Sequence, residues 1–132
     1  MLHPQTMHQF EGLKRRYPGA ELRELPSGAA LVTISDFAIP PGWNMKTTRV
    51  RFLVPVGYPG PAPDCFWASP GLRLASEAMP HASQEHPQIP ETNEGGLWFS
   101  WHVTGPETNW NPNRDSLETY VAIIAARFGR PQ

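Results

Sequence analysis

The chain is poor in cysteine, in charge of one sign and in long hydrophobic runs, and each shortage excludes a class of protein. Cys65 is the only cysteine, so neither an internal disulfide nor a cysteine-rich zinc site is expected. No run of five basic residues occurs and the formal net charge is −1, which argues against binding to nucleic acid or a membrane surface. No apolar run is long enough for a membrane span or a signal peptide. The sequence therefore predicts a cytoplasmic globular protein.

The chain is well supplied with proline, glycine and aromatic residues. It contains 16 Pro and 11 Gly, which together fall short of the share that marks low-complexity disorder, so long ordered loops are expected. Aromatic residues make up 11% of the chain, and their large rings can supply much of a small core. A length of 132 residues fits one domain over 1–132.

The spacing of apolar residues predicts a helix near each end of the chain. Apolar residues at steps of three and four predict one helix over 4–17 and another over 115–128. Asp115 or Asn113 is expected to cap the second helix. The apolar stripe of the first helix consists of Met7, Phe10, Leu13 and Tyr17.

Alternating segments between the two helices predict antiparallel strands. In the strand predicted over 47–54, Val50 and Phe52 share one face, and Arg49 and Arg51 share the other. The other strand segments are 20–25, 29–37 and 65–68. No period holds over 69–96, which predicts a long irregular loop, and 97–103 is an aromatic segment that could be extended. The order of elements predicts an α+β domain with a four-stranded antiparallel meander.

Four short motifs, in this order, resemble the ubiquitin-conjugating enzyme (UBC) family. They are the run Phe52-Leu53-Val54-Pro55-Val56-Gly57-Tyr58-Pro59, then His86-Pro87-Gln88-Ile89, then Trp110-Asn111-Pro112, and the apolar helix after it. They are similar to the family's F-x-P-x-x-Y-P strand end, its H-P-N-I and its W-x-P. The resemblance covers most of the chain. It implies a UBC-like fold with a long irregular active-site loop.

The chain departs from the family pattern where the catalytic residue stands. Typical members have a catalytic cysteine between H-P-N and W-x-P, and the interval 89–109 contains none. Gln88 also occupies the place of the family's asparagine. The sequence most resembles divergent bacterial members, whose segment before W-x-P is similar to W-S-R-H. Here that segment reads Phe99-Ser100-Trp101-His102.

Ser100 and His102 are therefore candidates for nucleophile and general base. Serine is a poor nucleophile until a base takes its proton, and residues i and i+2 of an extended segment point to the same side. The Gln88 amide is a candidate donor to the oxyanion, and the resemblance implies that His86 shapes the active-site loop. The alternative is that Ser100 is a small polar residue between aromatics and His102 a structural histidine.

Two further chemistries receive less support from the sequence. Cys65 follows a proline pair at the start of a predicted strand, so packing in the core is favoured over nucleophilic catalysis. A zinc site would need several histidines to converge, but His81 and His86 are five residues apart rather than at the helical spacing of four. The sequence predicts neither a metal nor a cofactor.

The resemblance implies a transferase that accepts a ubiquitin-like protein from an activating enzyme and passes it to a target amine, with a serine oxyester as the candidate intermediate. Bacterial members are typically encoded beside a ubiquitin-like protein, an activating enzyme and a JAB-type or other peptidase, so these are the expected partners. The alternative is a catalytically inactive UBC-like binding module that presents a ubiquitin-like protein or an activating enzyme. An unrelated α+β domain is a third possibility.

Overall fold

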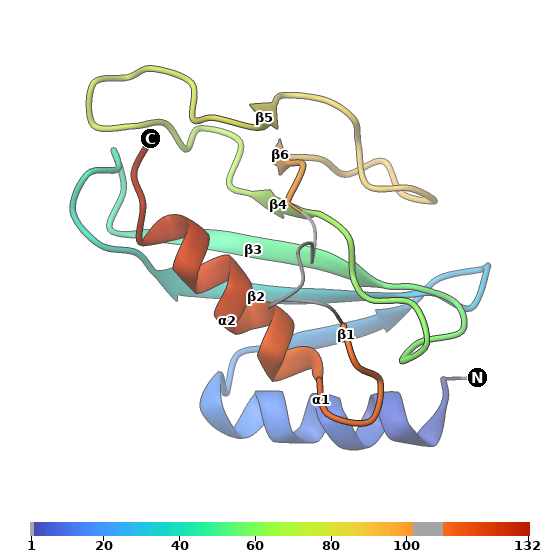
Figure 1. Ribbon diagram of the computed structural model, residues 1–132. Coiled ribbons are helices and arrows are strands. Elements are labelled where there is room, and N and C mark those ends of the chain that lie inside the picture. Colours follow the sequence, from blue (N-terminus) through green and yellow to red (C-terminus); the bar gives the residue numbers. More distant parts are fainter. Residues whose placement is uncertain (1, 102–109) are drawn as a thin grey trace.

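The protein has a helix near each end and one antiparallel sheet between them (Figure 1). The structure is a computed structural model that describes residues 2–101 and 110–132. Its elements are α1 (Pro4–Arg16), β1 (Glu21–Glu24), β2 (Ala30–Ala38), β3 (Thr47–Val54), β4 (Phe66–Ala68), β5 (Ser83–Gln84), β6 (Leu97–Phe99) and α2 (Leu117–Phe128). The α+β class and both terminal helices are confirmed.

Among the described residues the sheet has six strands, in the order β1-β2-β3-β4-β6-β5. The expected sheet of four strands is therefore too small. The first four strands do form an antiparallel meander. β6 then pairs with β4, and β5 pairs with the outer side of β6. β5 is only two residues long, and so short an edge strand leaves no periodic signal in the sequence.

Both helices pack on one face of the sheet, where the larger apolar core lies. The alternation of β3 directs Val50 and Phe52 into this core, where both are fully buried. The Phe52 ring meets that of Tyr120 from α2 at 5.2 Å, and Phe66 stacks on Phe99 at 4.8 Å. The predicted orientation of β3, with its arginines on the other face, is confirmed.

Two details of the helices differ from expectation. Met7 is 41% exposed, whereas Phe10 and Leu13 are buried, because α1 lies along the edge of the sheet and presents Met7 to a surface groove. Ser116 is the N-cap of α2, and its N–H bonds to Thr119 Oγ1 at 3.0 Å. Asp115, expected as the cap, instead accepts a hydrogen bond from the Asn111 N–H at 2.8 Å and closes the preceding turn.

The other face of the sheet is covered by the chain between β5 and β6 rather than by a helix. Ile89 from this segment is buried against Trp67 and Leu31 of the sheet. The Trp67 Nε1–H donates to the Pro87 carbonyl at 2.8 Å. We call residues 87–95 the clamped loop. Within the described residues, neither helix has the length and apolar character that crossing a bilayer requires.

Candidate functional site

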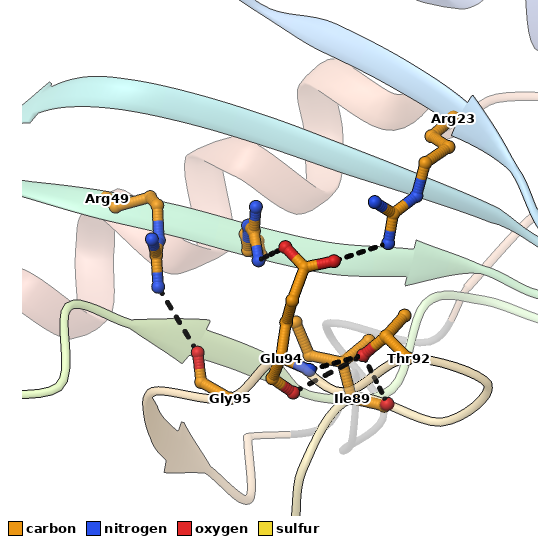
Figure 2. Close-up of polar contacts among 7 residues, drawn as sticks. Arg23, Arg49, Ile89, Thr92, Glu94 and Gly95 are labelled. Atoms are coloured by element: carbon orange, nitrogen blue, oxygen red, sulfur yellow. Dashed lines mark hydrogen bonds and ion pairs between the residues drawn. The ribbon is translucent and has the colours of Figure 1, made fainter.

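Three arginines from the sheet hold the clamped loop. Arg51 Nη1 lies 2.7 Å from Glu94 Oε1, and Arg23 Nη2 lies 2.9 Å from Glu94 Oε2 (Figure 2). Arg49 donates to the Gly95 carbonyl at 3.2 Å. The alternation that buries the apolar residues of β3 places its two arginines on this face. One carboxylate therefore ties the loop to both β1 and β3.

The charge of Glu94 is stabilised by these contacts. The hydrogen bonds from Arg23 and then Arg51 hold the pKa of Glu94 below its usual value. Burial, followed by the neighbouring charge of Arg51, lowers the pKa of Arg49. A carboxylate between clustered cations relieves their mutual repulsion, so Glu94 is central to this network.

The loop is also folded on itself and fastened at its tip. The Ile89 N–H donates to the Glu94 carbonyl at 2.9 Å, and the Thr92 hydroxyl donates to the Ile89 carbonyl at 2.7 Å. At the tip, the Ser27 hydroxyl and N–H both donate to the Glu91 carboxylate, at 2.6 and 2.8 Å. The loop therefore has a defined shape on the sheet.

His86 directly precedes the clamped loop and Gln88 lies near its start, and both are exposed. Gln88 lies beside Gly95, where an added Cβ would be 3.7 Å from Gln88 Cγ. At Gly96 a Cβ would come within 2.3 Å of the Ala68 carbonyl oxygen, so only glycine fits there. Gly95, the neighbour of Gln88, thus carries no side chain, and neither does the next residue, Gly96.

Ser100 is half-exposed and directly follows β6. Its N–H donates to the Ala82 carbonyl at 2.9 Å, which extends the pairing of β6 with β5. Ser100 is therefore at the end of β6 opposite to Gly96, roughly 13 Å along the strand for a separation of four residues. The structure does not bring Gln88 beside Ser100. His102, the candidate base, lies outside the described residues.

Cys65 is half-buried and stands just before β4 rather than within it. It packs against the apolar cluster of the loop-covered face. Burial raises the pKa of the Cys65 thiol, and a hydrogen bond with Trp98 partly opposes that rise. The pairing of Phe66 with Phe99, continued by one residue, places Cys65 opposite Ser100.

The other motif residues have structural contacts. Trp110 Nε1–H donates to the Pro59 carbonyl at 2.7 Å, and the Trp110 and Tyr58 rings are 5.9 Å apart. The buried Tyr58 hydroxyl donates to the Gln9 side chain, which also accepts the Leu117 N–H at 3.1 Å. Burial raises the pKa of Tyr58, which keeps this donor protonated. These contacts fasten the loop after β3 to both helices.

Sequence reasoning missed the role of Glu94, although a signal was present. Arg49 and Arg51 on one face of a strand, followed by a long segment containing Glu91 and Glu94, indicate an acidic loop across a basic face. Among the described residues, no three His, Cys, Asp or Glu side chains gather as a metal site would require.

Comparison with known proteins places most of the chain in one family. The model of prokaryotic E2 family E matches residues 17–130, a span that includes the sheet, the clamped loop, Ser100 and α2. No curated protein and no solved structure matches the chain. The chain belongs to prokaryotic E2 family E, a bacterial family related to the ubiquitin-conjugating enzymes.

Proposed function

We propose that the protein is a ubiquitin-conjugating-like transferase. It accepts the C-terminal acyl group of a ubiquitin-like protein from an activating enzyme and passes that group to a target amine. The family match over residues 17–130 supports a ubiquitin-conjugating-like function in general, and the partners and the acyl transfer are proposed from the resemblance. A peptidase of the JAB or another type is proposed as a further partner, on the resemblance alone.

Ser100 is the proposed acyl acceptor. Its hydroxyl oxygen attacks the carbonyl carbon of the thioester on the activating enzyme, the C–O bond forms, and the C–S bond breaks. The thiolate leaves on the activating enzyme, and the serine proton passes to His102. The target amine nitrogen then attacks the oxyester carbonyl carbon, the N–C bond forms and the C–O bond breaks. The serine oxygen regains its proton from His102, and the proton that the amine loses passes to the imidazole that this frees. The half-exposure of Ser100 is compatible with this role.

His86 and Gln88 require a different role in the described state, because they lie at the other end of β6. Both are exposed, one just before the clamped loop and one within it, and they are proposed to contact the arriving ubiquitin-like protein. Donation by the Gln88 amide to an oxyanion at Ser100 would require the loop to move along the sheet.

A binding module without catalysis is the second candidate, and two observations favour it. The residue beside Gln88 is Gly95, which has no side chain and so offers no nucleophile. Burial raises the pKa of the Cys65 thiol and so disfavours the reactive thiolate. Such a module would present a ubiquitin-like protein or the activating enzyme to another subunit.

The decisive experiment uses the ubiquitin-like protein and the activating enzyme encoded nearest to this protein's gene. After incubation with ATP, an adduct that hydroxide cleaves and thiols do not indicates an oxyester. Ser100→Ala is expected to abolish the adduct, and Ser100→Cys to restore one that thiols cleave. Ser76→Ala is the matched control, because Ser76 is also a serine, is exposed, and is far from Ser100 in the sequence. His102→Ala is expected to slow adduct formation by about 10²–10⁴-fold.

Each other result points elsewhere. An adduct that survives in Ser100→Ala but disappears in Cys65→Ser identifies the cysteine as the acceptor. Binding of the ubiquitin-like protein or the activating enzyme without any adduct supports the binding module.

A further inference from the structure

An open groove of about 900 Å³ runs between α1 and β1. Its floor is apolar, with Met7 and Phe10 from the helix and Leu22 from the strand. Met7 is one of the few large hydrophobic side chains with substantial exposure. Exposed apolar surface in a concave site is typical of a binding groove.

One wall of the groove is the edge of the sheet. β1 is the terminal strand, so β2 pairs with only one of its sides. The Leu25 N–H donates to the Ala29 carbonyl, and the same register makes Arg23 and Leu31 a hydrogen-bonded pair. Alternation in an antiparallel ladder then directs the N–H and C=O of Leu22 away from β2, toward the groove. An edge with outward donors and acceptors is a template for another strand.

The charge around the groove favours a basic occupant. Three carboxylates line it, and only two cations do. The carboxylates are Glu11, Glu21 and Glu24. Arg23 is already paired with Glu94 of the clamped loop, and Glu24 also has a partner. With both set aside, two carboxylates, Glu11 and Glu21, line the groove against one cation, Lys14.

The position of α1 favours a peptide over a second copy of the chain as the occupant of the groove. Figure 1 shows α1 running beside β1, and residues of both elements line the groove, so the helix is its other wall. A second copy paired along β1 would bring its own α1 into the same space. A single extended segment meets no such obstacle.

We propose that this groove binds an extended polypeptide segment of a partner protein that alternates apolar and basic residues, and that the segment adds a strand to β1. Its apolar side chains face Met7, Phe10 and Leu22, and its basic side chains lie near Glu21. Backbone hydrogen bonds to Leu22 supply affinity, and the alternation supplies specificity. The inference is independent of the chemistry proposed at Ser100.

The test uses a fluorescent synthetic octapeptide that alternates valine and lysine, with fluorescence anisotropy as the readout. Met7→Lys is expected to weaken binding about tenfold or more, because an ammonium replaces an apolar contact and repels the peptide. Met79→Lys is the matched control, since Met79 is 43% exposed against 41% for Met7 and lies outside the groove. The control should bind like the wild type.

Charge and backbone bonding are tested separately. Glu21→Lys should lower affinity for the lysine peptide and raise it for a peptide that alternates valine and glutamate. Amide hydrogen exchange at Leu22 should slow when the lysine peptide binds, while that at Arg23, already paired with β2, should change little. A peptide N-methylated at alternate residues should lose binding.

Three results would overturn the proposal. The first is equal affinity of Met7→Lys and Met79→Lys for the lysine peptide. The second is equal affinity of the wild type for the lysine and glutamate peptides. The third is a concentration-dependent dimer that Met7→Lys dissociates and the peptide does not, which would assign the groove to a second copy.

Discussion

The two faces of the sheet are covered by different means. Under the helices, aromatic rings from α2 and the sheet pack together, with Phe128 meeting both Phe66 and Phe99. Under the clamped loop, a small apolar cluster is bordered by ion pairs to Glu94. Apolar packing is non-directional and scales with buried area, whereas ion pairs and carbonyl contacts fix particular atoms. We infer that the helix face supplies most of the stability and the loop face fixes local geometry.

The two faces meet at β4, where neighbouring residues point in opposite directions. Phe66 belongs to the helix-side core and Trp67 to the loop-side cluster. Both are almost fully buried, at 0% and 2% exposure. Substitutions at these two positions therefore compare the faces within one strand.

The largest effect is expected on the helix face. Phe66→Ala removes a ring stacked on Phe99 and in contact with Phe128, and should lower the free energy of unfolding by about 3–5 kcal/mol. Urea denaturation followed by circular dichroism measures the change. Phe66→Leu keeps most of the volume and should cost less than half as much. Equal losses for the two variants would mean that ring packing is not what holds this face.

The next largest loss of stability is expected from a substitution of Glu94, which holds the clamped loop. Glu94→Gln keeps the shape of the side chain but leaves Arg51, whose side chain is only 13% exposed, without its carboxylate partner. The free energy of unfolding should fall by about 1–2 kcal/mol, toward the low end because Glu94 itself is 38% exposed. Urea denaturation at neutral pH measures it. Glu85→Gln is the control, because its pair with Arg73 leaves that carboxylate 65% exposed. A larger loss in the control would contradict the central role of Glu94.

The lowered pKa of Glu94 also predicts that its contribution to stability depends on pH. The pKa of Glu94 is lower in the folded protein than in the unfolded chain, where it is about 4.3. The contribution of Glu94 to the free energy of unfolding is therefore complete above that unfolded pKa. It is lost as the pH falls through the folded pKa. The stability difference between wild type and Glu94→Gln should shrink as the pH is lowered below about 4. A difference that is constant over this range would show that the charge of Glu94 is not responsible.

The helix face was largely predictable because its signals are periodic. The strand over 47–54 was predicted with its observed bounds, and both helices were found, because a buried stripe recurs at a fixed spacing. β5 was missed because two residues have no period. Met7 was misplaced because apolar spacing identifies a helix face without revealing where the sheet beneath it ends.

The loop face was predictable only in part, because its contacts join segments far apart in the sequence. Arg23 and Glu94 are 71 positions apart in the sequence, and Ser27 and Glu91, which are hydrogen-bonded, are 64 positions apart. The motif at His86 located the loop but not what holds it. The positions of Gln88 and Ser100 at opposite ends of β6 follow from the β5–β6 register, which no local pattern specifies.

A smaller effect is expected at Trp67. Trp67→Phe keeps an aromatic ring in the loop-side cluster but removes the hydrogen bond from Nε1 to the Pro87 carbonyl. The free energy of unfolding should fall by about 1 kcal/mol, less than for Phe66→Ala. Amide exchange measured by NMR should rise in the clamped loop more than in β2. A uniform rise through the sheet would mean that the two faces are coupled more tightly than their contacts indicate.

The smallest effect on stability is expected at Cys65. The alkylation rate of its thiol instead measures how firmly the clamped loop covers it. Burial in the loop-side cluster raises the pKa of the thiol, so iodoacetamide should alkylate Cys65 more slowly than it alkylates free cysteine at the same neutral pH. The rate should increase with pH as the thiolate forms. Glu94→Gln, which loosens the loop, should accelerate alkylation, whereas Phe66→Leu, on the other face, should leave the rate nearly unchanged. Mass spectrometry of the alkylated protein over time measures these rates. If Phe66→Leu accelerates the reaction as much as Glu94→Gln does, the thiol is exposed by general loosening of the sheet, and the two faces do not act separately.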